Sequence, residues 1–270
     1  MAVNQFKIRS NWKPRVESPE ELGVRTLRSL DSISALSPFF RDWEFLDLFR
    51  DPFEMTEENI GEFLFPLEQV RSQVTEIVKR GVRKDDFDRP DPGGGYGISV
   101  SNSNVPDAER VTLSANGGAP LSYASAWREA CFRTDSDTEP DPAIVAYPLF
   151  KSVLLAIVSS WNVDFAQAFS SELVSLWETA ILPFCDLSWM VYLSAPLATR
   201  IVIPTDVVIE RTDDGGLLMI AAEETFDAAN PAHIAAARSI VAALEPLNAE
   251  LAKERAKFET WRRPDKGNAV

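Results

Sequence analysis

The chain has 270 residues, of which 45% are hydrophobic, so it can bury a sizeable core in one large domain or two modest ones. Its formal net charge is -14, from 41 acidic and 27 basic residues. A DNA- or RNA-binding protein needs a basic face to neutralise phosphates, so this charge argues against direct nucleic-acid binding. An acidic protein instead suits either solubility or a basic partner.

The negative charge is concentrated in one stretch of the chain. Residues 1–134 hold 21 acids and 17 bases, and residues 231–270 hold 5 acids and 7 bases. Residues 135–230 hold 15 acids against the bases Lys151, Arg200 and Arg211, a net charge of -12. A surface built from this middle stretch is therefore the first place to look for contacts with a basic partner.

The N-terminal third predicts a strand followed by helices. Residues 6–9 alternate apolar and polar side chains, which indicates an opening strand. Ser18 and Glu21 have the spacing of a capping box, and Pro19 suits the first helical position, so a helix is expected to begin there. Its predicted buried stripe is Leu22, Leu27, Leu30 and Ile33. Two further helices are predicted over residues 56–65 and 68–80.

The middle of the chain predicts an antiparallel meander between two acidic loops. Residues 84–97 are rich in Asp, Pro and Gly, which is typical of a long loop, and residues 134–142 form a second acidic loop. Three strand-like runs lie between these loops, at residues 96–101, 110–115 and 123–133. Because their separators contain Pro-Asp and Asn-Gly-Gly turn chemistry, we expect neighbouring strands to pair antiparallel.

The second half adds short strands and an apolar helix. The helix is predicted over residues 149–161. The strands are predicted over residues 144–146, 189–193, 207–210 and 217–221. An Asp-Asp-Gly-Gly sequence at residues 213–216 predicts a hairpin turn between the last two strands.

A long helix is expected to close the chain. Asn230 is its predicted N-cap, Pro231 occupies the first helical position, and Pro246 should kink or restart it. Its predicted buried face is Ile234, Ala237, Val241 and Leu244. Helices and antiparallel strands in separate runs indicate an α+β fold, with one or more antiparallel sheets and packed helices. Residues 1–270 are expected to form a single domain, in which two α+β halves could meet near residue 145.

Cysteine usage and the chain's apolar runs favour a cytoplasmic protein. Cys131 and Cys185 are too few for a disulfide framework and lack zinc-ligand spacing, so both are interpreted as buried thiols. The N-terminus shows no charged leader followed by an apolar core. The longest apolar stretch, residues 147–161, is too short to span a bilayer. We therefore expect no membrane association.

Motifs for catalysis are scarce. His233 is the only histidine, so a Ser-His-Asp triad, a Cys-His dyad or a catalytic zinc site would all have to use it. Its position in the first turn of the final helix favours a structural role. The glycines of residues 93–97 lack the lysine and helix start of a phosphate-binding loop. The chain is therefore expected to have no catalytic residue, metal or cofactor.

Acidic loops supply the best candidates for a binding surface, since loops carry recognition more often than the scaffold beneath them. Four acids alternate along the second loop: Asp135, Asp137, Glu139 and Asp141. The spacing is superficially similar to a calcium loop, but the Gly and closing Glu of an EF-hand are missing and prolines intrude. A solvated loop, a partner-facing patch and a cation site all stay open.

Two further candidates lie in the N-terminal half. The first acidic loop carries Asp85, Asp86 and Asp88. Trp43, between charged neighbours, is the best candidate among the seven tryptophans for an exposed aromatic anchor. Together with the second loop, these residues form the predicted partner-binding set.

At this point the sequence resembles the immunity protein 52 family of bacterial polymorphic toxin systems. The likeness spans nearly the whole chain and lies in residues 11–40 with Trp43, in the glycine-led strand at residues 95–100, and in residues 189–194, 214–217, 226–227 and 230–233. The resemblance implies a cytoplasmic protein encoded beside a toxin, in several members a toxin with a restriction-endonuclease-like nuclease domain. The family offers no catalytic motif.

The favoured hypothesis is thus a protein that binds and neutralises a secreted toxin, a nuclease effector of a type VI or related secretion system, with its oligomeric state left open. An effector-loading chaperone is one alternative. A carboxylate-based metal hydrolase is another, although the Glu-x-Lys sequence of restriction-type nucleases is absent.

Overall fold

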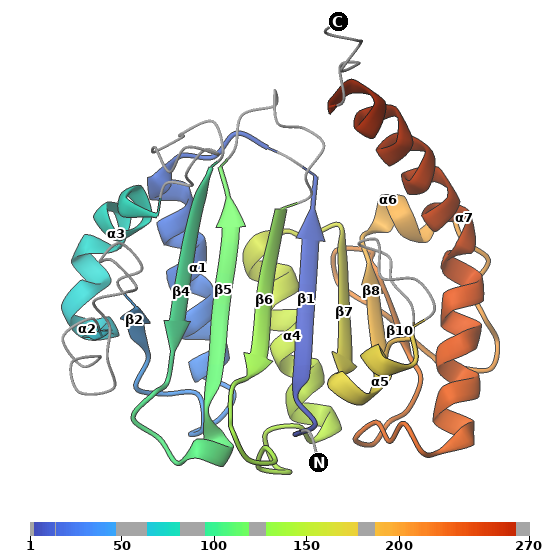
Figure 1. The fold of residues 1–270 in the computed structure, drawn as a ribbon, viewed down its shortest axis with the longest axis horizontal. Helices are drawn as coiled ribbons and strands as arrows, with labels where there is room; N and C mark the ends of the chain where they lie inside the picture. The colour runs from blue at the N-terminus through green and yellow to red at the C-terminus, as the bar shows by residue number, and fades with distance from the viewer. Residues whose placement is uncertain are drawn as a thin grey trace, which may run out of the picture.

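One antiparallel sheet runs across the molecule (Figure 1). The structure, a computed structural model, describes residues 3–13, 15–46, 64–81, 95–118, 128–177 and 187–262. Over these residues ten strands pair in the order β3-β2-β4-β5-β6-β1-β7-β8-β10-β9. Their bounds are Phe6–Trp12 (β1), Glu44–Leu46 (β2), Leu64–Pro66 (β3), Tyr96–Ser101 (β4), Val111–Gly117 (β5), Arg128–Thr134 (β6), Phe165–Ser170 (β7), Met190–Leu193 (β8), Val208–Arg211 (β9) and Leu217–Ile220 (β10).

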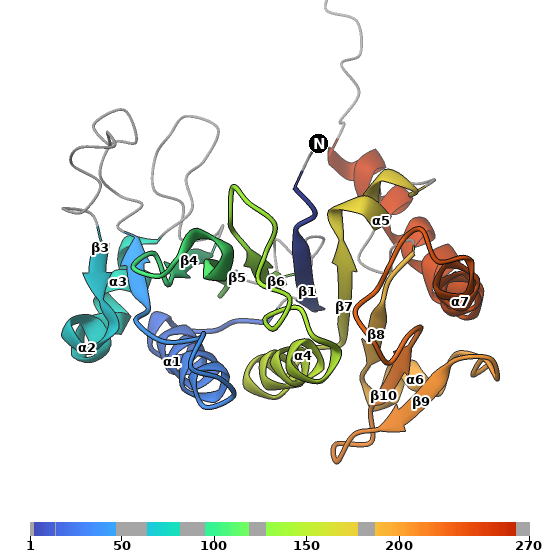
Figure 2. The same cartoon turned by 90° about the horizontal axis from the view of Figure 1, so that it is seen from below.

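Helices pack on both sides of this sheet. Their bounds are Pro19–Ser34 (α1), Leu67–Val70 (α2), Val74–Arg80 (α3), Tyr147–Trp161 (α4), Ser171–Ser175 (α5), Ala195–Ala198 (α6) and Pro231–Arg262 (α7), with 3-10 turns at Arg71–Gln73 and Asp107–Glu109. Figure 2 shows α1 and α4 beneath the centre of the sheet and α7 on the opposite side, beside β7 and β8. The α+β prediction, with antiparallel strands and a long C-terminal helix, is confirmed.

β1 joins the two halves of the chain. It pairs antiparallel with β6 on one side and with β7 on the other, so Ile8 lies between Phe132 and Ala168. All three are fully buried and belong to the main hydrophobic core, which α4 completes with residues such as Phe150 and Leu154. Because successive strand residues face opposite sides, the neighbours Lys7 and Arg9 point away from this core.

A second hydrophobic cluster lies under α7. Ile240 and Leu244 of the helix pack with Phe165 of β7, Val191 of β8 and Met219 of β10. Strands β7, β8 and β10 are therefore buried at every position, since helices cover both their faces. Within the described residues, no helix combines the length and apolarity that crossing a bilayer requires.

Local sequence signals determine where α1 and α7 begin. The Ser18 hydroxyl accepts a hydrogen bond from the Glu21 amide, and the Glu21 carboxylate accepts one from the Ser18 amide, which completes the predicted capping box. At α7, the Asn230 side chain accepts from the Ala232 amide at 2.9 Å. The helix continues through Pro246 to Arg262 without a restart, and Figure 1 shows it changing direction along its length.

Removal of the α1 cap should have a measurable cost. We expect Ser18→Ala to lower the free energy of unfolding by about 1 kcal/mol, because the Glu21 amide loses its acceptor. Urea denaturation followed by circular dichroism measures the change. Ser32→Ala, in the last turn of the same helix and away from the cap, is the matched control and should leave stability unchanged or slightly higher. Equal stability of the two variants would contradict the role of the cap.

Several sequence predictions are confirmed and others are wrong. The strands predicted at residues 96–101, 110–115, 189–193, 207–210 and 217–221 match β4, β5, β8, β9 and β10 within two residues at each end. The predicted hairpin turn joins β9 to β10, with Gly215 at a φ of 81°. Residues 144 and 145 lie in a turn and residue 146 precedes α4, so they form no strand, and residues 64 and 65 belong to β3 and not to a helix. β7 was not predicted. Trp127, Cys185 and most of residues 56–65 lie outside the described residues.

Candidate functional site

The loops at one end of the sheet gather carboxylates. Strands β4, β6, β7 and β10 end at the lower edge of the sheet in Figure 1, so their following loops meet there. These loops are residues 102–110, 135–146, 171–177 and 221–230, and Arg110 is their only Lys or Arg. Their acids are Asp107, Glu109, Asp135, Asp137, Glu139, Asp141, Glu172, Glu223, Glu224 and Asp227. We call this set the acidic edge.

Hydrogen bonds between the loops make the acidic edge one surface. The Asp141 amide donates to the Ala108 carbonyl at 2.8 Å, and the Thr225 hydroxyl donates to the Val145 carbonyl at 3.1 Å. Asn4 connects two further parts, because its amide donates to Glu139 and its side-chain oxygen accepts from the Glu172 amide. Segments far apart in the sequence therefore hold one another in place along this edge.

Asp107 fixes the shape of the second acidic loop. Its Oδ2 accepts from the amides of Asp137 and Thr138, both at 3.0 Å, and from the Thr138 hydroxyl at 2.8 Å. These hydrogen bonds, that of the Thr138 hydroxyl foremost, lower the pKa of Asp107, with a smaller contribution from Arg110. The carboxylate is thus ionised at neutral pH and acts as an anchor for the loop.

The four predicted carboxylates of this loop differ in their hydrogen bonds and ion pairs. Asp135 accepts from the Thr112 hydroxyl at 2.7 Å and pairs with Arg133 at 3.2 Å. Asp141 accepts from the Ala143 amide and Glu139 from the Asn4 amide. Asp137 is exposed, and no described residue contacts its carboxylate by hydrogen bond or ion pair. The structure therefore brings the four together on one loop, with Asp137 most available to a partner.

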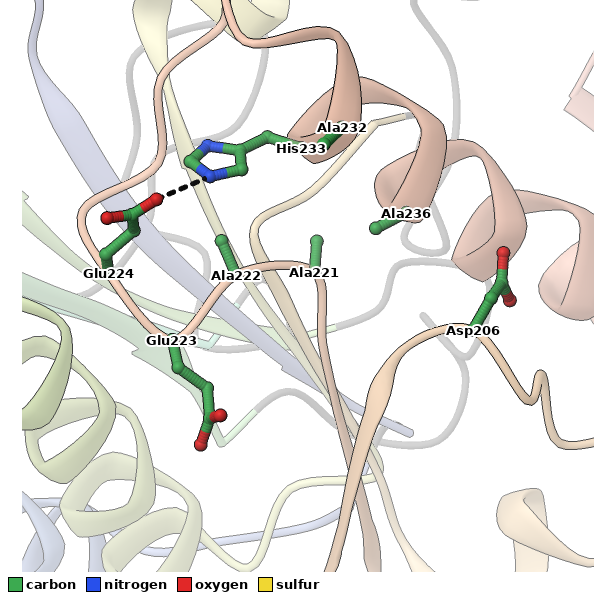
Figure 3. Close-up of a pocket in the computed structure, with 8 residues that line it drawn as sticks. All are labelled: Asp206, Ala221, Ala222, Glu223, Glu224, Ala232, His233 and Ala236. Carbon is green, nitrogen blue, oxygen red and sulfur yellow. Dashed lines mark hydrogen bonds and ion pairs between the residues drawn. The ribbon is translucent and has the colours of Figure 1, made fainter.

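A pocket at the start of α7 extends the acidic edge (Figure 3). Its volume is about 490 Å³, and its walls are Asp206, Ala221, Ala222, Glu223, Glu224, Ala232, His233 and Ala236. The four alanines supply a small apolar surface between carboxylates from two segments, Asp206 on one and Glu223 and Glu224 on the other. Apolar contact for the stem and carboxylates for the head suit a lysine or arginine side chain.

His233 holds the residues that form one wall of this pocket. Its Nδ1 accepts from the Asp227 amide at 3.1 Å, and its Nε2 lies 3.0 Å from Glu224 Oε1. The ring is 7% exposed and packs against Phe226 at a centroid distance of 5.2 Å. Both ring nitrogens are thus engaged in holding residues 224–227 to the first turn of α7.

Replacing His233 tests that structural role. We expect His233→Ala to reduce the free energy of unfolding by about 1–3 kcal/mol, because the Asp227 amide loses its acceptor and a small cavity forms. We also expect it to leave the hypothesised protection of toxin-expressing cells intact, since both ring nitrogens contact residues of this chain. Differential scanning calorimetry and a cell-survival assay measure the two effects. A folded variant that no longer protects would contradict the structural assignment.

The other candidates that the sequence suggested for a binding or metal site have different outcomes. Trp43 is 2% exposed, and its indole Nε1 donates to the Phe40 carbonyl and the Ser34 hydroxyl, so the expectation of an exposed anchor is wrong. Asp85, Asp86 and Asp88 lie outside the described residues. In the described part of the chain, no group of three or more His, Cys, Asp or Glu could hold a metal ion. Cys131 is half-buried on β6, and burial raises the pKa of its thiol.

Sequence reasoning missed the carboxylates beside α7 and the anchor Asp107. Asp206, Glu223, Glu224 and Asp227 all fall in the stretch of net charge -12, so the charge count was the available signal. Only the fold shows that the segment from Glu223 to Asp227 adjoins the loop at residues 135–146, where the Thr225 hydroxyl donates to the Val145 carbonyl.

Comparison with known proteins identifies the family. The family model described as immunity protein 52 matches residues 5–254, nearly the entire chain. The chain belongs to the immunity protein 52 family. As a member of a family of immunity proteins, it has a toxin as its partner.

A solved structure shares the fold of this immunity protein. It is a Pseudomonas aeruginosa T6SS protein, with 10% sequence identity, a TM-score of 0.52, and an alignment covering 90% of this chain and 73% of that chain. At this identity the likeness concerns the fold alone. A search of curated protein sequences finds no match.

Proposed function

We propose that this immunity protein neutralises a nuclease toxin, and that its acidic edge binds the basic groove in which the toxin holds nucleic acid. The observation that carries the proposal is the convergence of four acidic loops, with Arg110 as their only base, at one end of the sheet. A nuclease groove attracts phosphates with lysine and arginine side chains, so a surface rich in carboxylates complements it.

In this proposal, charge complementarity makes association with the toxin fast and keeps nucleic acid out of the toxin's groove. Opposite charges on two surfaces accelerate their encounter and suppress wrong partners. Once the acidic edge occupies the groove, nucleic acid is excluded from it. The pocket beside His233 supports the proposal, because one basic side chain of the toxin can enter it with its stem against Ala232 and Ala236.

The same proposal implies that the protein acts in the cytoplasm and that its toxin is delivered by a secretion system. A nuclease toxin damages a cell by reaching its nucleic acid, so protection requires an inhibitor in the cytoplasm. The structural neighbour is titled a T6SS protein, which supports a toxin delivered by a type VI secretion system. The proposed protein has no catalytic activity of its own and requires no cofactor.

Co-expression and inhibition with the product of the adjacent gene test the function. The toxin domain should degrade DNA or RNA in a gel assay, and an equimolar amount of this protein should stop the degradation. Cells that produce the mature toxin domain should survive only when this protein is present. A toxin domain that attacks another substrate would overturn the nuclease assignment. An effector-loading chaperone would bind the full effector without rescuing the cells.

A further inference from the structure

Three basic side chains lie together on the side of the sheet opposite α1 and α4. Lys7 and Arg9 belong to β1, and Arg133 belongs to the neighbouring strand β6. We call these three residues the cationic patch. Figures 1 and 2 show that no described helix covers this side of strands β4, β5, β6 and β1. The Arg9 and Arg133 side chains are 40% and 44% exposed, so a partner can reach them.

The arrangement of the cationic patch carries a cost. Lys7 and Arg133 are directly opposite each other in the antiparallel register of β1 and β6. Residues directly opposite share one face of a sheet, and like charges in such a pair are destabilising. Arg9 pairs with Glu129 at 3.0 Å and Arg133 with Asp135 at 3.2 Å, whereas Lys7 has no ion-pair partner in the described part of the chain.

This unfavourable pair needs an explanation beyond the fold. The chain has 41 acids, yet none of the described ones pairs with Lys7. Local arrangements that oppose stability are concentrated at functional sites. A negatively charged group from outside would attract both Lys7 and Arg133 and so offset the repulsion between them.

We propose that the cationic patch binds a carboxylate side chain of the toxin while the acidic edge binds the toxin's basic surface. The inference rests on the proposed function. Arg133 and Asp135 are paired, and Asp135 belongs to the acidic edge, so the two surfaces adjoin. A continuous interface would thus present negative charge in its loops and positive charge on the open sheet face.

The position of the cationic patch favours a protein carboxylate over a nucleic acid as its ligand. A nucleic-acid strand brings many phosphates, and the adjoining acidic edge would repel those beyond the patch. A single Asp or Glu surrounded by basic residues of the toxin matches both surfaces. Alternating charges of this kind fix the register of two partners and exclude others.

Charge reversal at the opposed pair tests the proposal. The variant Lys7→Glu/Arg133→Glu should raise the dissociation constant for the purified toxin domain at least about tenfold, because the toxin carboxylate then faces two acids. Its matched control is Arg28→Glu/Arg80→Glu, the same change in charge at exposed positions of α1 and α3. The control should bind within about twofold of the wild type. Biolayer interferometry at physiological salt measures both.

A single substitution separates binding from folding. Lys7→Gln removes the like-charge pair, so we expect its melting temperature to equal or exceed that of the wild type. Its affinity for the toxin domain should still fall about threefold or more, since one charge contact is lost. If the double variant fails to fold, the affinity of Lys7→Gln for the toxin domain tests the proposal by itself.

The outcomes distinguish this inference from the proposed function. Wild-type protein that does not bind the toxin domain would refute the function itself. Tight wild-type binding with unchanged affinity of the double variant and of Lys7→Gln would refute only the patch. Fluorescence anisotropy with a labelled DNA oligonucleotide should show no binding by the wild type. Binding that disappears in the double variant would overturn the assignment to a protein carboxylate.

Discussion

Neutralising three exposed carboxylates of the acidic edge is expected to slow association with the toxin domain about tenfold or more at low salt. The variant Asp137→Asn/Glu172→Gln/Glu223→Gln removes charge from three different loops of the edge. All three side chains are exposed, and no described residue forms a hydrogen bond or ion pair with their carboxylates. The fold should therefore be unaffected, and the loss should appear in the approach of the two proteins.

Salt dependence identifies the origin of this effect. At high ionic strength the wild type and the variant should associate at similar rates, because mobile ions screen charges beyond about 8–10 Å. The dissociation rate should change less than the association rate, since exposed charges act mainly before contact. Stopped-flow fluorescence at two salt concentrations measures both rates.

The control keeps the change in net charge constant. Glu68→Gln/Asp213→Asn/Glu245→Gln neutralises three exposed acids outside the acidic edge. If steering depends on the edge and not on the total charge, this control should associate almost as fast as the wild type. Equal slowing of both variants would mean that net charge alone drives the encounter. An unchanged rate for the edge variant would place the binding surface elsewhere.

The parts of the fold that were predictable depend on local chemistry. The box formed by Ser18 and Glu21 satisfies backbone groups within one turn, so its sequence signature needs no tertiary information. The same holds for the hairpin at residues 213–216, where Gly215 adopts the positive φ that the turn requires. Alternation along β4 was also visible, because only one face of that strand is buried.

The unpredicted parts depend on contacts between distant segments. β7 is buried on both faces, under α4 through Ala168 and under α7 through Phe165, so it shows no alternation of apolar and polar residues. The centre of the sheet, where β1 lies between β6 and β7, pairs residues more than 100 positions apart. Trp43 was misjudged for a different reason: its charged neighbours in the sequence suggested exposure, whereas its buried indole donates to Ser34 and to Phe40.

The candidate site was predictable in composition and not in shape. The charge count identified residues 135–230, and the loop containing Asp137 was named directly. Its proximity to Glu223 arises because β6 and β10 end at the same edge of the sheet, which no sequence pattern indicates. The opposition of Lys7 and Arg133 likewise exists only in the register of two strands.

The largest loss of stability is expected at Trp189, which ties the core to the acidic edge. Its indole is fully buried, stacks on Phe150 with ring centroids 5.5 Å apart, and donates from Nε1 to the Ala222 carbonyl at 2.9 Å. Ala222 lines the pocket and directly precedes Glu223. We expect Trp189→Ala to lower the free energy of unfolding by about 3–5 kcal/mol, a large share of the stability of a typical domain.

A smaller substitution isolates the link to the pocket. Trp189→Phe keeps an aromatic ring in the core but leaves the Ala222 carbonyl without its donor, so it should cost about 1–3 kcal/mol. Hydrogen exchange of the amides at residues 221–224 should then accelerate more than exchange in β8, because this segment loses its tether to the core. Guanidinium denaturation of both variants, with Val202→Ala at an 84% exposed position as control, measures the stability changes. If the Phe variant loosened β8 and left residues 221–224 protected, the acidic edge would owe its shape to its own loop contacts and to His233, and not to the core beneath it.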